Sequence, residues 1–283
     1  MHAPATGNQE FEFVKQLARD LARGDIKLPS FPAVVVRIRG MLEDEACDFA
    51  QVGKVVSADA VLVSRLFVFA NSAYHNRSGE KVASLEAAIA RLGLELVRNT
   101  ALSLAVKQLM LAEKHKSVVG YVRNIWARSM RIASLSFALA ELSDDVNEES
   151  AFMCGLLHEI GMLYILTKAK DFPDFLGDDA SLKEVLNEWH TQVGRSIVEA
   201  WGFPKEVVQS MDPVEFLNEH THVPAAPVDA VYAATRLLDI SEDDWSGLVN
   251  LPACQKLNVN EESLPRLVTA YRDKLASVQQ SLA

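Results

Sequence analysis

The residue types best suited to chemistry in this sequence are two histidines and one glutamate, namely His158, Glu159 and His190. Imidazole and carboxylate groups bind divalent cations, and a bound cation lowers the pKa of its water and polarises a phosphoryl oxygen. These side chains could therefore serve metal-dependent hydrolysis if the fold brings them together. A histidine beside an apolar stripe is more often a packing residue than a ligand, so His190 also has a purely structural interpretation.

Motifs for other chemistries are absent from the sequence. It contains no G-x-S-x-G, no Walker loop, no dinucleotide-binding glycine pattern and no H-E-x-x-H. The three cysteines, Cys47, Cys154 and Cys254, are far apart and form no C-x-x-C pair. This argues against a disulfide framework and against a cysteine zinc site, and it fits a reducing compartment.

Composition and charge favour a globular protein of the cytoplasm. The 283 residues are 49% hydrophobic and 23% charged, which is typical of one large or two medium-sized folded cores. The formal net charge is −10 and no run of lysines or arginines is present, so nucleic acid is not an expected partner. The apolar stretches 60–70 and 160–166 are interrupted or too short to cross a bilayer, and no basic-then-apolar leader opens the chain. No membrane partner is expected.

Apolar residues recur at spacings of three and four, without the alternation of strands, and this predicts an all-α fold. Capping residues place several helices. Gly24 ends a first helix from about residue 11, Asp59 begins a helix over 60–71, and Ser84 begins one over 85–92 that Gly93 ends. Further helices are expected over 33–42, 48–57, 94–112, 118–142, 204–211, 228–240 and 264–282.

Two other expected helices carry the candidate chemistry. The range 147–167 is apolar on nearly all sides, which predicts one central, buried helix that contains His158 and Glu159. The next apolar stripe predicts an amphipathic helix that carries His190 and ends at Gly202. Ser181 with Glu184 resembles a capping box and should begin this second helix.

A charged break at 113–116 marks the expected boundary between two helical lobes. The predicted organisation is an N-terminal helix or extension over 1–24, an N-terminal helical lobe over 25–115, and a second helical lobe with the C-terminal helices over 116–283. Neither an internal repeat nor a low-complexity tract is present.

Three stretches, taken in order, resemble the HDOD family, which are signalling relatives of the HD-superfamily phosphohydrolases. The first is L-P-S-F-P at 28–32, followed by V-V-S-A-D at 55–59 and L-V-S-R-L-F-V-F-A-N-S-A at 62–73, and the second is S-L-E-A-A-I-A-R-L-G at 84–93. The third runs from Trp126 through G-L-L-H-E-I-G at 155–161 and E-W-H at 188–190 to W-G-F-P at 201–204. The resemblance implies an N-terminal multi-helix bundle packed on an HD-like helical lobe.

The resemblance also implies where the metal ligands of the hydrolase relatives would fall. Arg128 stands at the first histidine position, and this permanent cation cannot bind a metal. His158-Glu159 stands at the His-Asp position, and His190 at a further histidine position. Thr235 stands near the late aspartate, where its hydroxyl replaces a carboxylate.

The additional methylene of a glutamate moves its carboxylate by about an ångström relative to aspartate, against a tolerance of about 0.2 Å in metal-ligand distances. A structural role for Glu159 is therefore expected, and Arg128 could be its counter-charge. Because both are placed in an apolar setting, His158 and Glu159 should have buried hydrogen-bond partners.

Two further ligand positions also depart from the pattern of the catalytic relatives. The paired histidines of the catalytic relatives are missing at 210–213, and Asp229 and Asp239 are out of register with the late aspartate. We interpret both aspartates as solvated or capping carboxylates. No metal or other cofactor is expected; if a metal does bind, its ligands are His158, Glu159 and His190.

An incomplete metal site favours a non-catalytic signal-transduction or scaffold protein that binds a protein partner in trans. Two alternatives remain open. One is a divergent metal-dependent phosphohydrolase, and the other is a nucleotide-sensing pseudo-enzyme in which Arg128 pairs with a phosphate. Candidate contact surfaces for a partner are the loop 71–81, the charged segment 113–116 and a groove between the lobes.

Overall fold

The computed structural model describes residues 5–24, 26, 49–72, 75–76, 79–112, 116–219 and 224–282. Across these ranges every regular element is a helix and none is a strand, so the all-α fold predicted from the apolar spacing is confirmed. The helix predicted over 33–42 lies outside the described residues, as do parts of the loop 71–81 and of the segment 113–116.

Contacts divide the chain into two units, and each unit joins segments that are distant in sequence. Unit 1 comprises Met1–Pro29 with Met110–Leu264, and unit 2 comprises Ser30–Leu109 with Pro265–Ala283. The domain boundaries expected from the sequence follow chain order alone, and they stay a prediction.

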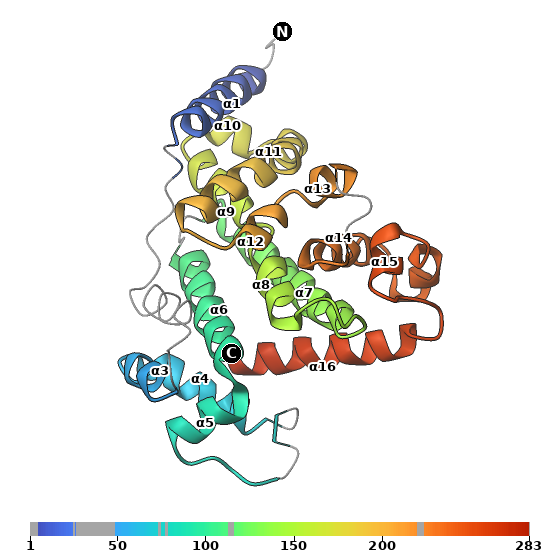
Figure 1. Ribbon diagram of the computed structural model, residues 1–283. Helices are drawn as coiled ribbons and strands as arrows, with labels where there is room; N and C mark the ends of the chain where they lie inside the picture. The colour runs from blue at the N-terminus through green and yellow to red at the C-terminus, as the bar shows by residue number, and fades with distance from the viewer. Residues whose placement is uncertain are drawn as a thin grey trace. The chain divides into compact units, whose positions relative to one another are not determined.

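Unit 2 is formed by α3 (Phe49–Val56), α4 (Ala60–Ala70), α5 (Leu85–Leu92), most of α6 (Leu94–Ala112) and nearly all of α16 (Leu264–Leu282) (Figure 1). Helix α5 packs against both α3 and α4. Asp59 caps α4 by accepting hydrogen bonds from two backbone N–H groups at 3.0 Å, and Ser84 caps α5 by accepting one from Ala87 at 3.1 Å. Gly93 follows α5 with a φ of 79°, so these predicted helix ends are confirmed.

Unit 1 is organised around α7 (Val119–Ala140), which packs against α8 (Glu148–Leu157) and α14 (Pro227–Leu238) (Figure 1). Helix α9 (Ile160–Ala169) packs in turn against α11 (Asp179–Ala200). The N-terminal helix α1 (Ala5–Arg23) lies on α10 (Pro173–Leu176) and α11, and the ring of Phe13 stacks on that of Phe175 with centroids 4.8 Å apart. Gly24 follows α1 with a φ of 66°, as predicted.

Four shorter elements complete unit 1: α12 (Lys205–Gln209), α13 (Pro213–Glu219), the 3-10 helix η1 (Glu242–Leu248) and α15 (Pro252–Lys256). Helix α12 lies inside the range predicted for it. The sequence analysis did not predict α13, η1 or α15, whose five to seven residues show little of a helical period.

The single helix predicted over 147–167 is wrong, since the chain forms α8 and α9 with a break at His158-Glu159. Glu159 has φ −97° and ψ 12°, which lies outside the α-helical region. Neither residue of the break is a proline or a glycine, and both side chains make tertiary contacts, His158 with the carbonyl of Ser210 and Glu159 with Arg128. The run 148–169 as a whole is long and apolar enough to span a membrane, but 89% of its window is buried inside the protein, which is typical of a core segment.

The capping box predicted at Ser181 and Glu184 is also wrong. Helix α11 begins earlier, at Asp179, and its N-cap is Asp178. The Asp178 carboxylate accepts from the backbone N–H groups of Ala180 at 3.1 Å and Ser181 at 3.3 Å. An aspartate that satisfies two free N–H groups is a strong helix start, which explains why the helix extends beyond the serine. The predicted end at Gly202, with a φ of 68°, is confirmed.

Candidate functional site

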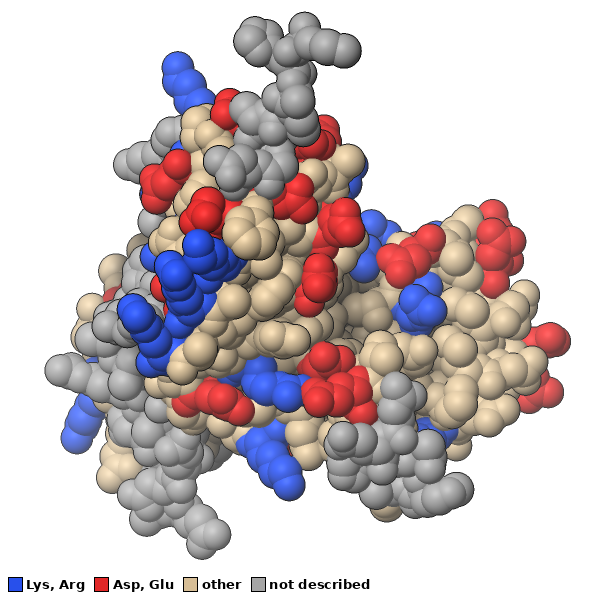
Figure 2. Space-filling model, turned by 90° about the horizontal axis from the view of Figure 1, so that it is seen from above, with Lys and Arg blue, Asp and Glu red and all other residues tan. Residues whose placement is uncertain are grey.

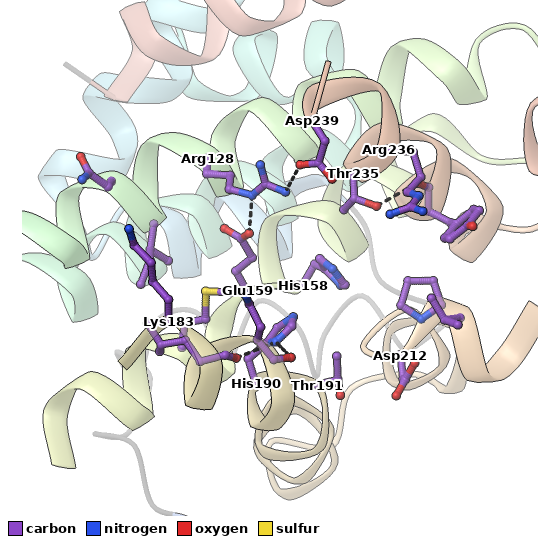
Figure 3. Close-up of a pocket in the computed structure, with 18 residues that line it drawn as sticks. Arg128, His158, Glu159, Lys183, His190, Thr191, Asp212, Thr235, Arg236 and Asp239 are labelled. Carbon is purple, nitrogen blue, oxygen red and sulfur yellow. Dashed lines mark hydrogen bonds and ion pairs between the residues drawn. The ribbon is translucent and has the colours of Figure 1, made fainter. Parts of the chain in front are cut away.

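A cavity of about 680 Å³ opens in unit 1, and all five sequence-predicted site positions line it (Figure 3). Residues more than a hundred positions apart in the chain meet there because α7, α11 and α14 converge on the break between α8 and α9. The members of this group are Arg128 from α7, His158 and Glu159 from the break, His190 from α11 and Thr235 from α14.

Two glycines allow the helices of the site to approach so closely. A Cβ built on Gly161 would overlap the backbone carbonyl of His190 and lie 2.7 Å from the nitrogen of Gly194, where α9 crosses α11. A Cβ on Gly155 would lie 2.8 Å from the Cα of Ala133, where α8 crosses α7. Each glycine therefore replaces a side chain that would push two site-bearing helices apart.

The two histidine rings of the site face each other edge to face, with centroids 5.8 Å apart. The Nδ1 atom of His158 lies 3.0 Å from the carbonyl oxygen of Ser210, and that of His190 lies 2.9 Å from the carbonyl oxygen of Leu186. A carbonyl can only accept, so each Nδ1 carries the proton and each Nε2 carries a lone pair. In this tautomer a histidine can bind a metal through Nε2.

Both rings are uncharged at neutral pH. Burial, with a smaller contribution from His190, lowers the pKa of His158 to about 4. Burial likewise lowers the pKa of His190 below its ordinary value, although its backbone hydrogen bonds oppose the shift. The rings therefore contribute two acceptors and no positive charge to the cavity.

Glu159 is held by an arginine. The Arg128 Nε donates to Glu159 Oε1 at 2.7 Å, and its Nη2 donates to Asp239 Oδ1 at 3.1 Å (Figure 3). The glutamate side chain is 3% exposed, whereas those of Arg128 and Asp239 are 38% and 49% exposed. The counter-charge predicted for Glu159 is therefore present, and a third group shares it.

Opposing forces act on this ion pair. Burial raises the pKa of Glu159 above its ordinary value, and the adjacent guanidinium of Arg128 opposes that rise. Burial also lowers the pKa of Arg128, but the carboxylates of Glu159 and Asp239 outweigh it, so the net shift is upward. The guanidinium is thus fixed in its charged form beside the one buried carboxylate of the cavity.

The remaining sequence-predicted carboxylates behave differently from each other. Asp229 is fully buried and accepts from the backbone N–H of Ala226 at 2.9 Å, so its interpretation as a capping residue is confirmed. Asp239 is about half exposed, but it also binds Arg128, a role that the sequence analysis missed. It stands one helical turn after Thr235, and this i, i+4 spacing is the signal that could have placed it at the site. The Thr235 hydroxyl donates to the carbonyl of Tyr232 at 2.8 Å.

Sequence reasoning also missed three charged residues of the cavity wall: Lys183, Asp212 and Arg236. Lys183 lies two helical turns before His190, so both lie on the same face of α11. Lys183 and Arg236 are exposed, and they occupy opposite sides of the pocket in Figure 3. They add positive charge to the wall of a cavity in which the buried carboxylate of Glu159 is already paired with Arg128.

The donor set does not fit the metal centre of a hydrolase. Within the described ranges, no group of three or more histidine, cysteine, aspartate or glutamate side chains is placed to hold one metal ion. One oxygen of the Glu159 carboxylate, Oε1, already accepts from Arg128, and the other, Oε2, is buried without a hydrogen-bond partner among the described residues. The two imidazoles and this arginine-paired carboxylate are therefore not grouped around one point, as the three protein ligands of a catalytic zinc site are.

The described elements and this pocket define an all-α protein with a polar cavity enclosed by helices. The sequence model of the HDOD domain matches residues 28–215, which is more than half of the chain. The chain belongs to the HDOD family.

Several solved structures share the fold. A protein of Shewanella amazonensis SB2B, described as a "Putative metal-dependent phosphohydrolase", is 22% identical with a TM-score of 0.79, and the match covers 98% of this chain and 100% of that one. An HDOD domain protein of Geobacter sulfurreducens is 21% identical with a TM-score of 0.65 over 92% and 97% of the two chains. A "Putative signal transduction protein" of Marinobacter aquaeolei VT8 is 19% identical with a TM-score of 0.63 over 97% and 66%. No curated protein matches this chain.

Proposed function

We propose that this chain is a non-catalytic signalling protein that acts by binding a protein partner in trans. The observation that carries the proposal is the 2.7 Å ion pair between Arg128 and Glu159 inside the HD-like pocket. A hydrolase of this type needs the carboxylate to bind a cation that activates water. Here a guanidinium neutralises that carboxylate, and it would also repel an approaching metal ion.

The structure of one candidate contact loop supports a binding role. At its start the Asn71 side chain donates to the carbonyl of Val82 at 3.3 Å and accepts from its N–H at 2.9 Å. Arg91 donates to the carbonyls of Ala70 at 3.1 Å and Glu80 at 2.9 Å. These hydrogen bonds hold the described ends of the loop 71–81 against unit 2. Binding loops are commonly held by a rigid scaffold in this way.

Surface charge also favours a protein partner over nucleic acid. On the face shown in Figure 2, basic and acidic side chains are interspersed, and the described residues gather in no single-sign field. With a net charge of −10, the chain lacks the electrostatic basis for sequence-independent binding to phosphate backbones.

Metal analysis tests the non-catalytic part of the proposal. Purified protein, loaded with Mn²⁺, Fe²⁺ or Zn²⁺ and then desalted, is expected to retain far less than one ion per chain and to leave bis(p-nitrophenyl) phosphate intact. His158→Ala should behave identically. Stoichiometric metal and phosphodiesterase activity that are both lost in His158→Ala would establish the hydrolase alternative instead.

Affinity capture tests the partner-binding part. The tagged full chain should retain a defined protein from a lysate of its own host cells, and purified components should then bind each other directly. Lys81→Glu, an exposed charge reversal in the candidate loop, should weaken this binding at least about tenfold. The matched control is Lys54→Glu, an exposed reversal on α3 of the same unit. Equal effects of the two charge reversals would show that the loop 71–81 is not part of the binding interface.

The nucleotide-sensing alternative rests on a different observation, which is the pair of exposed cations Lys183 and Arg236 at the cavity. Arg128 already pairs with two carboxylates, so these two residues are better placed to meet a phosphate. Acid extraction of purified protein followed by chromatography would reveal a bound nucleotide. A nucleotide that is lost in Lys183→Gln, without turnover, would select this alternative.

A further inference from the structure

A second cavity, of about 380 Å³, lies in unit 1 between α13, α14 and α15. Its volume falls within the range of small-molecule sites, which runs from about 300 to 1,000 Å³. Its apolar walls include Val214 and Leu217 from α13, Tyr232 from α14 and Ala253 from α15. The charged residues that line it are Asp229 and Lys256.

These two charged residues form a buried and incompletely satisfied ion pair. The Lys256 Nζ lies 3.2 Å from Asp229 Oδ1, and the two side chains are 17% and 0% exposed. Neither atom has a partner that meets hydrogen-bond geometry, although both are shielded from water. An ammonium group has three N–H donors, and donors that are buried without acceptors are costly. The cavity therefore contains unused hydrogen-bond donors in an otherwise apolar setting.

The charge of the pair selects the kind of molecule that would satisfy these donors. Lys256 and Asp229 sum to zero charge, so an ionic ligand would leave one net charge beside an ion pair that is already balanced. That charge would lose hydration without gaining an unpaired counter-charge. A neutral acceptor adds no charge, and an apolar body would match the Val214, Leu217 and Ala253 walls.

We propose that this second cavity binds a small, neutral molecule with an apolar body and a carbonyl oxygen that accepts a hydrogen bond from Lys256 Nζ. An ammonium group has three N–H donors, so Lys256 can donate to the ligand while it stays beside Asp229. The site is separate from the ion pair that carries the proposed function.

Occupancy of this site has a consequence for the larger cavity. Val214 and Tyr232 line both cavities, so a ligand that displaces either side chain also reshapes the wall of the HD-like pocket. Helix α13, which carries Val214, is joined to α11 through an ion pair between Arg195 and Glu215. Binding of a small molecule in the second cavity can therefore affect α11, the helix of His190, through these contacts.

Methyl NMR of the full chain tests the ligand class with three probes of one shape: 4-phenylbutanamide, 4-phenylbutanoate and butylbenzene. The neutral amide should shift the methyl signals of Val214, Leu217 and Ala253 in a saturable manner. The carboxylate anion and the hydrocarbon should bind at least about tenfold more weakly, since the anion adds an uncompensated charge and the hydrocarbon offers no acceptor. Equal affinity for all three, or shifts that avoid these methyl groups, would overturn the proposal.

Variants distinguish binding of the amide through Lys256 from non-specific binding of any apolar probe in the second cavity. The double change Lys256→Met with Asp229→Asn removes both charges together, retains an acceptor for the Ala226 N–H and leaves no buried charge alone. It should weaken the amide at least about tenfold while leaving butylbenzene unchanged. Val214→Trp, which enlarges a side chain that lines the cavity, should block all probes, whereas Val61→Trp, at a similarly exposed valine of unit 2, should not. Undiminished amide binding by the double variant would refute the role of Lys256.

Discussion

Gly161 and His190 meet backbone to backbone where α9 crosses α11. A Cβ on Gly161 would overlap the carbonyl oxygen of His190 and lie 2.7 Å from the nitrogen of Gly194, and backbone atoms cannot rotate away as a flexible side chain can. The contact fixes the distance between the two histidine-bearing segments of the HD-like pocket.

Gly161→Ala is therefore expected to lower the free energy of unfolding by about 3 kcal/mol, because the crossing helices must separate. It should also disturb the ring signals of His158 and His190 in NMR spectra. The matched control is Gly120→Ala on α7, where a Cβ would meet nothing within 4 Å. That substitution should raise stability by about 0.5 kcal/mol, and a similar loss at both positions would contradict the packing argument.

The parts of the fold that were predictable from the sequence are those fixed by local chemistry. The caps at Asp59 and Ser84 and the turn at Gly93 depend on atoms within a few residues, so their residue types were sufficient. The break at His158-Glu159 was not predictable, because it depends on contacts with Ser210 and Arg128, distant in sequence. Apolar periodicity indicates that a segment is buried, but not where tertiary contacts interrupt it.

The same distinction applies to the candidate site. The resemblance to the HDOD family placed Arg128 and Glu159 at two ligand positions of the same metal site, so their side chains were expected to lie close together. Opposite charges that lie close together favour pairing. Their 2.7 Å contact was therefore foreseeable. Asp239 was missed because its role depends on α14 turning its carboxylate toward α7, which needs the packing of two distant helices.

The start of α11 provides a test of the revised helix cap. Asp178 satisfies two backbone N–H groups, whereas the hydroxyl of Ser181 donates to Asp178 at 3.3 Å. Asp178→Ala should cost about 1 kcal/mol in urea unfolding, and Ser181→Ala should cost less than half as much. The reverse order would restore the capping box that the sequence suggested.

His158 should make the free energy of unfolding depend on pH. Its folded-state pKa is about 4, and its ordinary value is 6.5, so the unfolded state takes up a proton first as the pH falls. The stabilisation by the neutral ring is fully present above about pH 6.5 and is lost between there and about pH 4. The loss at pH 5 should amount to about 2 kcal/mol.

Urea unfolding of the wild type and of His158→Asn at pH 7.5 and pH 5 measures this loss of stability. The asparagine amide can still donate to the carbonyl of Ser210 but does not titrate. The wild type should lose about 2 kcal/mol more than the variant between the two pH values. Parallel pH profiles would show that the His158 ring is not held neutral by burial.

The final prediction concerns the Arg128–Glu159 pair itself. Arg128→Met leaves the buried carboxylate without its cation and should cost about 3 kcal/mol at pH 8. With the cation gone, burial meets less opposition and raises the folded-state pKa of Glu159 further. A raised carboxyl pKa means that the folded state binds the proton more tightly, so the destabilisation should shrink as the pH falls toward 5.

Two companion variants decide whether this cost arises from the buried charge. Arg128→Met combined with Glu159→Gln contains no unpaired carboxylate, so it should recover most of the lost stability and lose the pH dependence. Asp239→Asn removes only the half-exposed partner of Arg128 and should change stability by no more than about 0.5 kcal/mol, because solvent screens that pair. If Arg128→Met and Asp239→Asn cost the same at every pH, the pocket is wet enough for Glu159 to be solvated. A solvated carboxylate could then reach a cation, which would weaken the case against hydrolysis.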